Sequence, residues 1–97
     1  MIVGTMRVEL SLPENGTLKD KRHVVKSLLA RVRNKFQVAA AEIEDNDDLE
    51  SAVLGVVCVS NSAPHANEIL QHAINFIESN VLQGTLEDYQ IEIVHAL

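Results

Sequence analysis

LKDKRHVVKSLLARVRNKF, residues 18–36, is the stretch that decides the fold of this 97-residue chain. At helical spacing its apolar residues fall on one wide face, which predicts a core-packing helix; they are Leu18, Val24, Val25, Leu28, Leu29, Val32 and Phe36. Thr17 is a favourable N-cap, and Asp20 stands where a capping box places its carboxylate. Asn15 and Gly16 form a turn signal just before the helix.

The same helix carries seven of the eight Lys and Arg residues. Cations in its first turn oppose the helix dipole, yet a positive helix start with added cations attracts anions, most commonly phosphate. This pattern indicates an anion- or RNA-binding surface, and an ordinary solvated face is the alternative. The candidate binding residues are Lys19, Lys21, Arg22, Lys26 and Arg33.

Charge is divided unevenly along the chain. Residues 1–35 hold 8 basic and 3 acidic residues (+5), while residues 36–97 hold 11 acidic residues and no Lys or Arg (−11), which together give the net charge of −6. Such asymmetry favours contact with nucleic acid or a self-complementary assembly, whereas the overall negative charge argues against non-specific coating of nucleic acid.

Composition indicates a single domain, residues 1–97, with 46% apolar residues to build a core. No apolar run reaches the length of a membrane span, and the start lacks a signal-peptide pattern, so we expect a cytoplasmic protein without membrane contact. Cys58 is the single cysteine, which excludes an internal disulfide and a cysteine zinc cluster. We expect no cofactor.

Working outward from the helix, the pattern predicts strands over residues 2–12, 37–44, 52–60 and 86–96. The second strand alternates imperfectly, which a bulge near Ala41 or Glu42 would reconcile. A second helix is expected to begin after a cap at Asn61 or Ser62 and to end near residues 83–84. The β-α-β-β-α-β order predicts an α+β, ferredoxin-like plait: a four-stranded antiparallel sheet with both helices on one face.

The bare face of that sheet is expected to carry an apolar strip. The strand over residues 52–60 is apolar on both sides, and we predict that Leu54, Val56 and Cys58 lie on the bare face, beside Thr5 and Arg7. An exposed apolar strip needs a cover, most simply another subunit, so these three residues are the candidate interface of a homo-oligomer.

Two long runs carry a resemblance to a known family. MIVGTMRVELSLPENGTLKDKRHVVKSLLARVRNKFQVAAAE and AVLGVVCVSNSAPHANEIL resemble the YlxP-like family of small bacterial proteins of unknown function, and LKDKR at residues 18–22 is among its most specific marks. The resemblance implies a ferredoxin-like fold. Genes of the family often lie near translation-initiation and ribosome-maturation genes, which hints at RNA. The family has no established catalytic residues, so none is transferred to this chain.

Other chemistries find little support. An RNA-recognition motif stacks bases on aromatics of its central strands, and here those strands have none. The four histidines form no i, i+4 pair for a metal, and the acidic loop over residues 45–51 lacks the glycine and final glutamate of an EF-hand. Neither Cys58 nor Ser60 or Ser62 has an evident base. We therefore expect no metal site and no catalytic residues.

Two functional hypotheses remain. The first is a non-enzymatic binding module that associates with RNA or the ribosome through the basic helix. The second is an oligomeric protein-interaction module whose basic helix pairs with an acidic protein surface.

Overall fold

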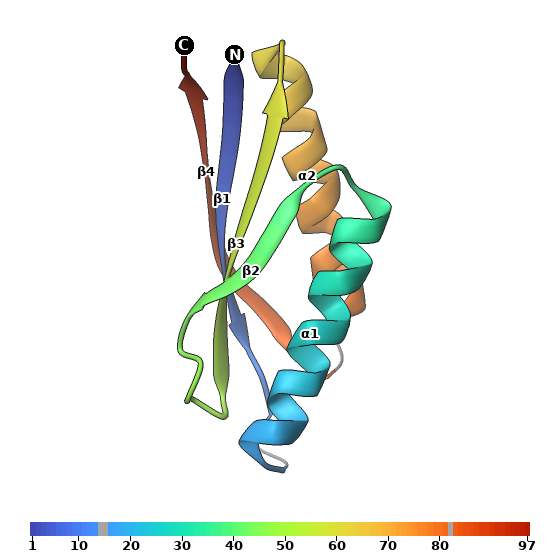
Figure 1. Ribbon diagram of the computed structural model, residues 1–97. Helices are drawn as coiled ribbons and strands as arrows, with labels where there is room; N and C mark the ends of the chain where they lie inside the picture. The colour runs from blue at the N-terminus through green and yellow to red at the C-terminus, as the bar shows by residue number, and fades with distance from the viewer. Residues whose placement is uncertain (14–15, 82) are drawn as a thin grey trace.

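The computed structural model describes residues 1–13, 16–81 and 83–97. Its elements are β1 (Ile2–Ser11), α1 (Leu18–Lys35), β2 (Ala39–Glu44), β3 (Ser51–Ser60), α2 (Ala63–Asn80) and β4 (Thr85–His95). The sheet has the order β2-β3-β1-β4 with antiparallel neighbours, and both helices cover one face of it (Figure 1). This arrangement confirms the predicted ferredoxin-like plait.

The start of α1 is held by the predicted capping box. The Thr17 hydroxyl accepts the Asp20 N–H at 3.2 Å, and the Asp20 carboxylate accepts the Thr17 N–H at 3.0 Å. Gly16 precedes the cap at a φ of 147°, a conformation that favours glycine, while its predicted turn partner Asn15 lies outside the described residues. The backbone N–H groups of Thr17 and Asp20 therefore both have hydrogen-bond acceptors within the chain.

The second helix begins as predicted but ends earlier. Ser62 is the N-cap and accepts the His65 N–H at 3.3 Å. The last helical residue is Asn80, three residues before the predicted end. The Asn80 side chain donates to the Phe76 carbonyl at 2.8 Å, so a side chain satisfies a carbonyl near the end of the helix.

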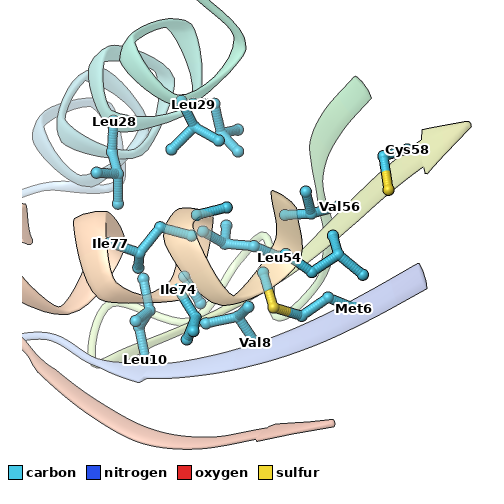
Figure 2. Close-up of a cluster of buried hydrophobic side chains, with 14 of the residues drawn as sticks. Met6, Val8, Leu10, Leu28, Leu29, Leu54, Val56, Cys58, Ile74 and Ile77 are labelled. Carbon is cyan, nitrogen blue, oxygen red and sulfur yellow. The ribbon is translucent and has the colours of Figure 1, made fainter. Parts of the chain in front are cut away.

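The core lies between the helices and one face of the sheet. Along β1 the alternate residues Met6, Val8 and Leu10 are buried and point toward the helices, as the period of two predicts (Figure 2). Leu28 and Leu29 of α1 enter the same core from the opposite side (Figure 2). We call the sheet surface away from the helices the open face.

Strand boundaries agree with the prediction to within two residues. The predicted bulge lies in β2, where the pairing with β3 shifts between Glu42 and Glu44. Ile43 therefore has no direct partner, and it packs over Gly55, where an added Cβ would meet the Ile43 Cγ2 at 3.0 Å. The bulge explains why the alternation of this strand is imperfect in the sequence.

Candidate functional site

Four of the five predicted binding residues form a basic stripe along α1. Lys19, Arg22, Lys26 and Arg33 are all exposed. Lys19 and Lys26 make no hydrogen bond or ion pair with any described residue, so both ammonium groups are available to an anion in solution. The stripe runs for about 21 Å, at 1.5 Å per helical residue.

Lys21, the fifth predicted residue, does not belong to this surface. Its side chain is buried, where its Nζ lies 3.1 Å from Glu42 Oε2 and donates to the Asp45 carbonyl at 2.5 Å. Lys21 is therefore not the cation open to phosphate that its place in the basic helix predicts, because its side chain is buried between α1 and the sheet. The physical reason is the position of Glu42, which lies on the helix-facing side of β2 and would be an unpaired buried carboxylate without a cation.

The acidic loop between β2 and β3 lies beside the first turns of α1. Arg22 contacts Asp47 at 3.3 Å, while Lys21 contacts the backbone of Asp45. Within the loop, the Glu50 N–H donates to Asp48 at 2.8 Å, and this bond, helped by Ser51, lowers the pKa of the Asp48 carboxyl. Carboxylates thus already stand near the helix start, which leaves the part of the stripe toward Arg33 more favourable to an added anion.

Arg33 joins the stripe to the edge of the sheet. Its guanidinium donates to the Ala40 carbonyl of β2 at 2.7 Å, while the residue as a whole is exposed. On the other side of α1, Arg31 and Lys35 lie over the Phe76 ring, 5.3 and 5.4 Å from its centroid. The exposed cations of α1 therefore divide between the basic stripe and a pair that packs against Phe76 of α2.

The prediction of the oligomer interface is wrong, because its three residues lie on the helix-facing side of β3. Leu54, Val56 and Cys58 are buried at 0–2% exposure and point toward the helices (Figure 2). The register explains the error: Leu54 is opposite Val8 and Val56 is opposite Met6, and residues directly opposite each other share a face of the sheet. These three residues belong to the core and not to a surface that another subunit could cover.

The open face instead displays the other alternation of β3. Val59 lies opposite Val3, which lies opposite Val94, so three valines form a row across three strands. Val59 is 64% exposed and Val94 is 39% exposed. Toward the opposite end of the strands this face becomes charged, because Arg7 contacts both Glu9 and Glu44 there, and these two carboxylates raise its pKa.

The remaining polar candidates do not converge. Within the described parts of the chain, no three His, Cys, Asp or Glu side chains lie close enough to hold a metal ion. Cys58 is buried, and burial raises the pKa of its thiol. No helix of the described residues has the length and apolar character needed to cross a membrane.

Sequence reasoning missed Glu42 as the partner of Lys21. The available signal was the alternation of β2, which places Glu42 two residues from Ala40 on the helix-facing side. An acidic residue at a helix-facing position predicts a buried cation close by, and the first turns of α1 supply several. The bulge at Ile43 obscured this alternation.

The sequence is similar to those of proteins of unknown function. The model of a family described as protein of unknown function (DUF503) matches residues 3–91. The chain is 36% identical over 78 residues to the uncharacterized protein YlxP of Bacillus subtilis (strain 168), a match that covers 80% of this chain and 85% of that protein.

A solved structure is similar in fold. The solution NMR structure of a de novo designed protein with a ferredoxin fold, LFR1 1, aligns with a TM-score of 0.58 over 97% of this chain and 84% of its own. The two sequences are 12% identical, so the likeness concerns the fold alone. A designed protein with this fold carries no information about activity.

Proposed function

The chain belongs to the DUF503 family of proteins of unknown function, and we propose that it is a non-enzymatic binding module that contacts RNA phosphates, free or in the ribosome, through the basic stripe of α1. The observation that carries the proposal is the stripe itself. Lys19, Arg22, Lys26 and Arg33 are exposed along one edge of a single rigid helix, and Asp20 is the only acidic residue of α1.

The arrangement suits phosphate contact rather than base recognition. Lysine and arginine side chains on a helix surface reach phosphates, which position a protein on nucleic acid without reading its sequence. The open face supplies no aromatic platform. Phe36 and Phe76 pack against each other on the helix side, with ring centroids 5.7 Å apart, and Tyr89, opposite Val8, also lies on the helix-facing side of the sheet. Binding is therefore expected to depend on salt and to be weakly selective for sequence.

Salt dependence gives a quantitative expectation. Each phosphate that the protein neutralises contributes about −0.7 to −0.9 to the slope of log affinity against log salt. Contact by all four cations of the stripe gives a slope of about −3. Replacing Lys19 and Lys26 with glutamate should reduce that slope by about half, in addition to lowering the affinity.

A matched pair of variants tests the proposal. Fluorescence anisotropy would follow binding of structured RNA and of ribosomal subunits to Lys19→Glu/Lys26→Glu and to the control Arg31→Glu/Lys35→Glu. Both variants change the net charge equally, but the control changes the α1 edge that packs on Phe76. Loss of binding in the first variant alone supports the stripe. Equal loss in both, or no binding of the wild type at low salt, contradicts it.

The second candidate is a protein-interaction module that self-associates over the open face, with the stripe paired to an acidic protein surface instead of RNA. The row of Val3, Val59 and Val94 favours it, because the exposed Val59 and Val94 flank the half-buried Val3 and the three form a contiguous apolar patch. Sedimentation of Val59→Lys against wild type tests this candidate. A wild type that stays monomeric at high concentration would contradict it.

A further inference from the structure

The outer edge of β4 is the longest uncovered edge of the sheet. β4 spans 11 residues and pairs with β1 on one side only, and nothing in the described chain lies beyond it (Figure 1). The opposite edge, β2, is 6 residues long, is bulged at Ile43, and has the Ala40 carbonyl occupied by Arg33. Short or bulged edges resist strand addition, whereas a long regular edge is a template for it. The pairing of β4 with β1 is regular from Asp88 to His95.

Three contacts show which backbone groups of β4 point outward. The Ala96 N–H donates to Met1 at 2.8 Å, and the Glu92 carbonyl accepts the Thr5 hydroxyl at 3.3 Å, so even-numbered residues face β1. The Tyr89 N–H instead donates to its neighbour Asp88 at 2.8 Å. The backbone N–H and C=O groups of successive residues point to opposite edges of a strand. Those of Ile91 and Ile93 therefore also point outward, away from β1.

We propose that β4 pairs antiparallel with β4 of a second copy of this chain, centred on Ile91, to form a continuous eight-stranded sheet. In this register Ile91 lies opposite Ile91 of the second copy, and Tyr89 lies opposite Ile93. The backbone N–H and C=O groups of these residues all point outward, so both chains contribute hydrogen bonds to the pairing. The pairing also releases the Tyr89 N–H from Asp88 for the second strand.

Strand geometry selects this centre. It places Asp88 opposite Val94 and Glu92 opposite Gln90, so no two carboxylates are directly opposite each other in the two strands. Moving the centre to Tyr89 would run the pairing into Glu87, where the register with β1 shifts. Moving it to Ile93 would carry it past His95, the last residue of the strand. The Ile91 centre gives the longest regular overlap, residues 88–94.

Apolar contacts reinforce the pairing on the helix-facing side. Tyr89 is 40% exposed, and Ile91 and Ile93 are half-buried at the margin of the core. In the proposed dimer the Tyr89 ring lies against Ile93 of the second copy, and the two Ile91 side chains cover each other. Aromatic and β-branched residues form favourable cross-strand pairs.

The proposed dimer is independent of RNA binding, because it buries neither the basic stripe nor the open face. Both surfaces stay exposed in the eight-stranded sheet. The dimer can therefore be shown or excluded whatever the outcome of the RNA titrations, and Val59→Lys leaves it intact.

Mixed disulfide formation tests the register. Gln90 and Glu92 would be a directly opposite, non-hydrogen-bonded pair, with Cα atoms about 4.5 Å apart, a separation that a disulfide spans. A mixture of the Gln90→Cys and Glu92→Cys chains should give crosslinked dimer under mild oxidation at least tenfold faster than a mixture of Gln90→Cys with Val94→Cys. All three positions lie on the open face, and wild type corrects for the buried Cys58. Equal rates in the two mixtures would overturn the proposal.

Amide hydrogen exchange supplies an independent measurement on the unmodified protein. Raising its concentration should slow exchange at Ile91 and Ile93 at least tenfold, while Gln90 and Glu92, already bonded to β1, change little. The Tyr89→Lys variant should abolish this effect, because it places a cation against Ile93 of the second copy, whereas Val59→Lys should retain it. Exchange at Ile91 and Ile93 that is independent of concentration would rule the dimer out.

Discussion

The Lys21 ammonium lies 3.1 Å from the Glu42 carboxylate, with 3% and 12% of the two side chains exposed. Lys21 also donates to the Asp45 carbonyl, so one buried cation ties α1 to both β2 and the acidic loop. Removing either charge alone would leave the other desolvated and unpaired. This ion pair connects α1, which carries the basic stripe, to the edge strand β2.

The Lys21→Met variant should lower the free energy of unfolding by about 3–5 kcal/mol, because Glu42 would be left as an uncompensated buried carboxylate. The double variant Lys21→Met/Glu42→Leu should recover most of that loss, since both charges are then removed together. Urea denaturation followed by circular dichroism measures both effects. A loss below about 1 kcal/mol in the single variant would show that the pair is effectively solvated.

Val56→Asp and Val59→Asp should behave oppositely, although both replace a valine of β3. Val56 is fully buried, so a carboxylate there should cost about 4 kcal/mol or more of stability, or prevent folding. Val59 is 64% exposed, and its substitution should change stability by less than about 1 kcal/mol. Thermal unfolding of the two proteins distinguishes the faces. Comparable loss in both would mean that the assigned register of β3 is wrong.

Leu28→Ala and Leu70→Ala should each destabilise the protein by about 2–5 kcal/mol, as truncation of buried leucines does. Leu28 is 4% exposed on α1, and Leu70 is 0% exposed on α2. Denaturant titration gives the two values, with exposed Val59→Ala as the control. A shift smaller than about 1 kcal/mol at either leucine would place that side chain outside the core.

Cys58 should make stability fall at alkaline pH. Burial raises the pKa of its thiol in the folded state, so the folded protein holds the proton more tightly than the unfolded chain does. The stabilisation that the Cys58 thiol contributes is fully present below its unfolded-state pKa of about 8.5. It is lost as the pH rises through the pKa of the thiol in the folded protein. Denaturation of wild type and Cys58→Ala between neutral and alkaline pH measures the difference. Identical pH dependence in the two proteins would contradict the assignment.

The sequence alone determined the element order and the helix starts, because these depend on local backbone chemistry. Thr17 and Asp20 predict a capping box through hydrogen bonds within four residues, and the structure forms those bonds. The alternation of β1 likewise identified Met6, Val8 and Leu10 as one face. Such patterns need no knowledge of what lies across the sheet.

The candidate surfaces depended on contacts between distant residues, and there the sequence was partly misleading. Lys21 and Lys19 look equivalent in the sequence. The Lys21 side chain is nevertheless buried against Glu42 of β2, while Lys19 remains exposed. The stripe of four cations could be predicted from helical spacing, whereas the loss of the fifth could not. Burial of a charge depends on its partner, and that partner is 21 residues away along the chain.

The two faces of β3 show the same limit most clearly. Both alternations of this strand are apolar, so the period of two separates Leu54 and Val56 from Val57 and Val59 without saying which pair faces the helices. Only pairing with β1 decided it: Val8 lies opposite Leu54, and residues opposite each other in a sheet must share a face. A slip of one residue would have exposed Leu54 and buried Val57, and the close packing of the core against α2 selects between the two registers.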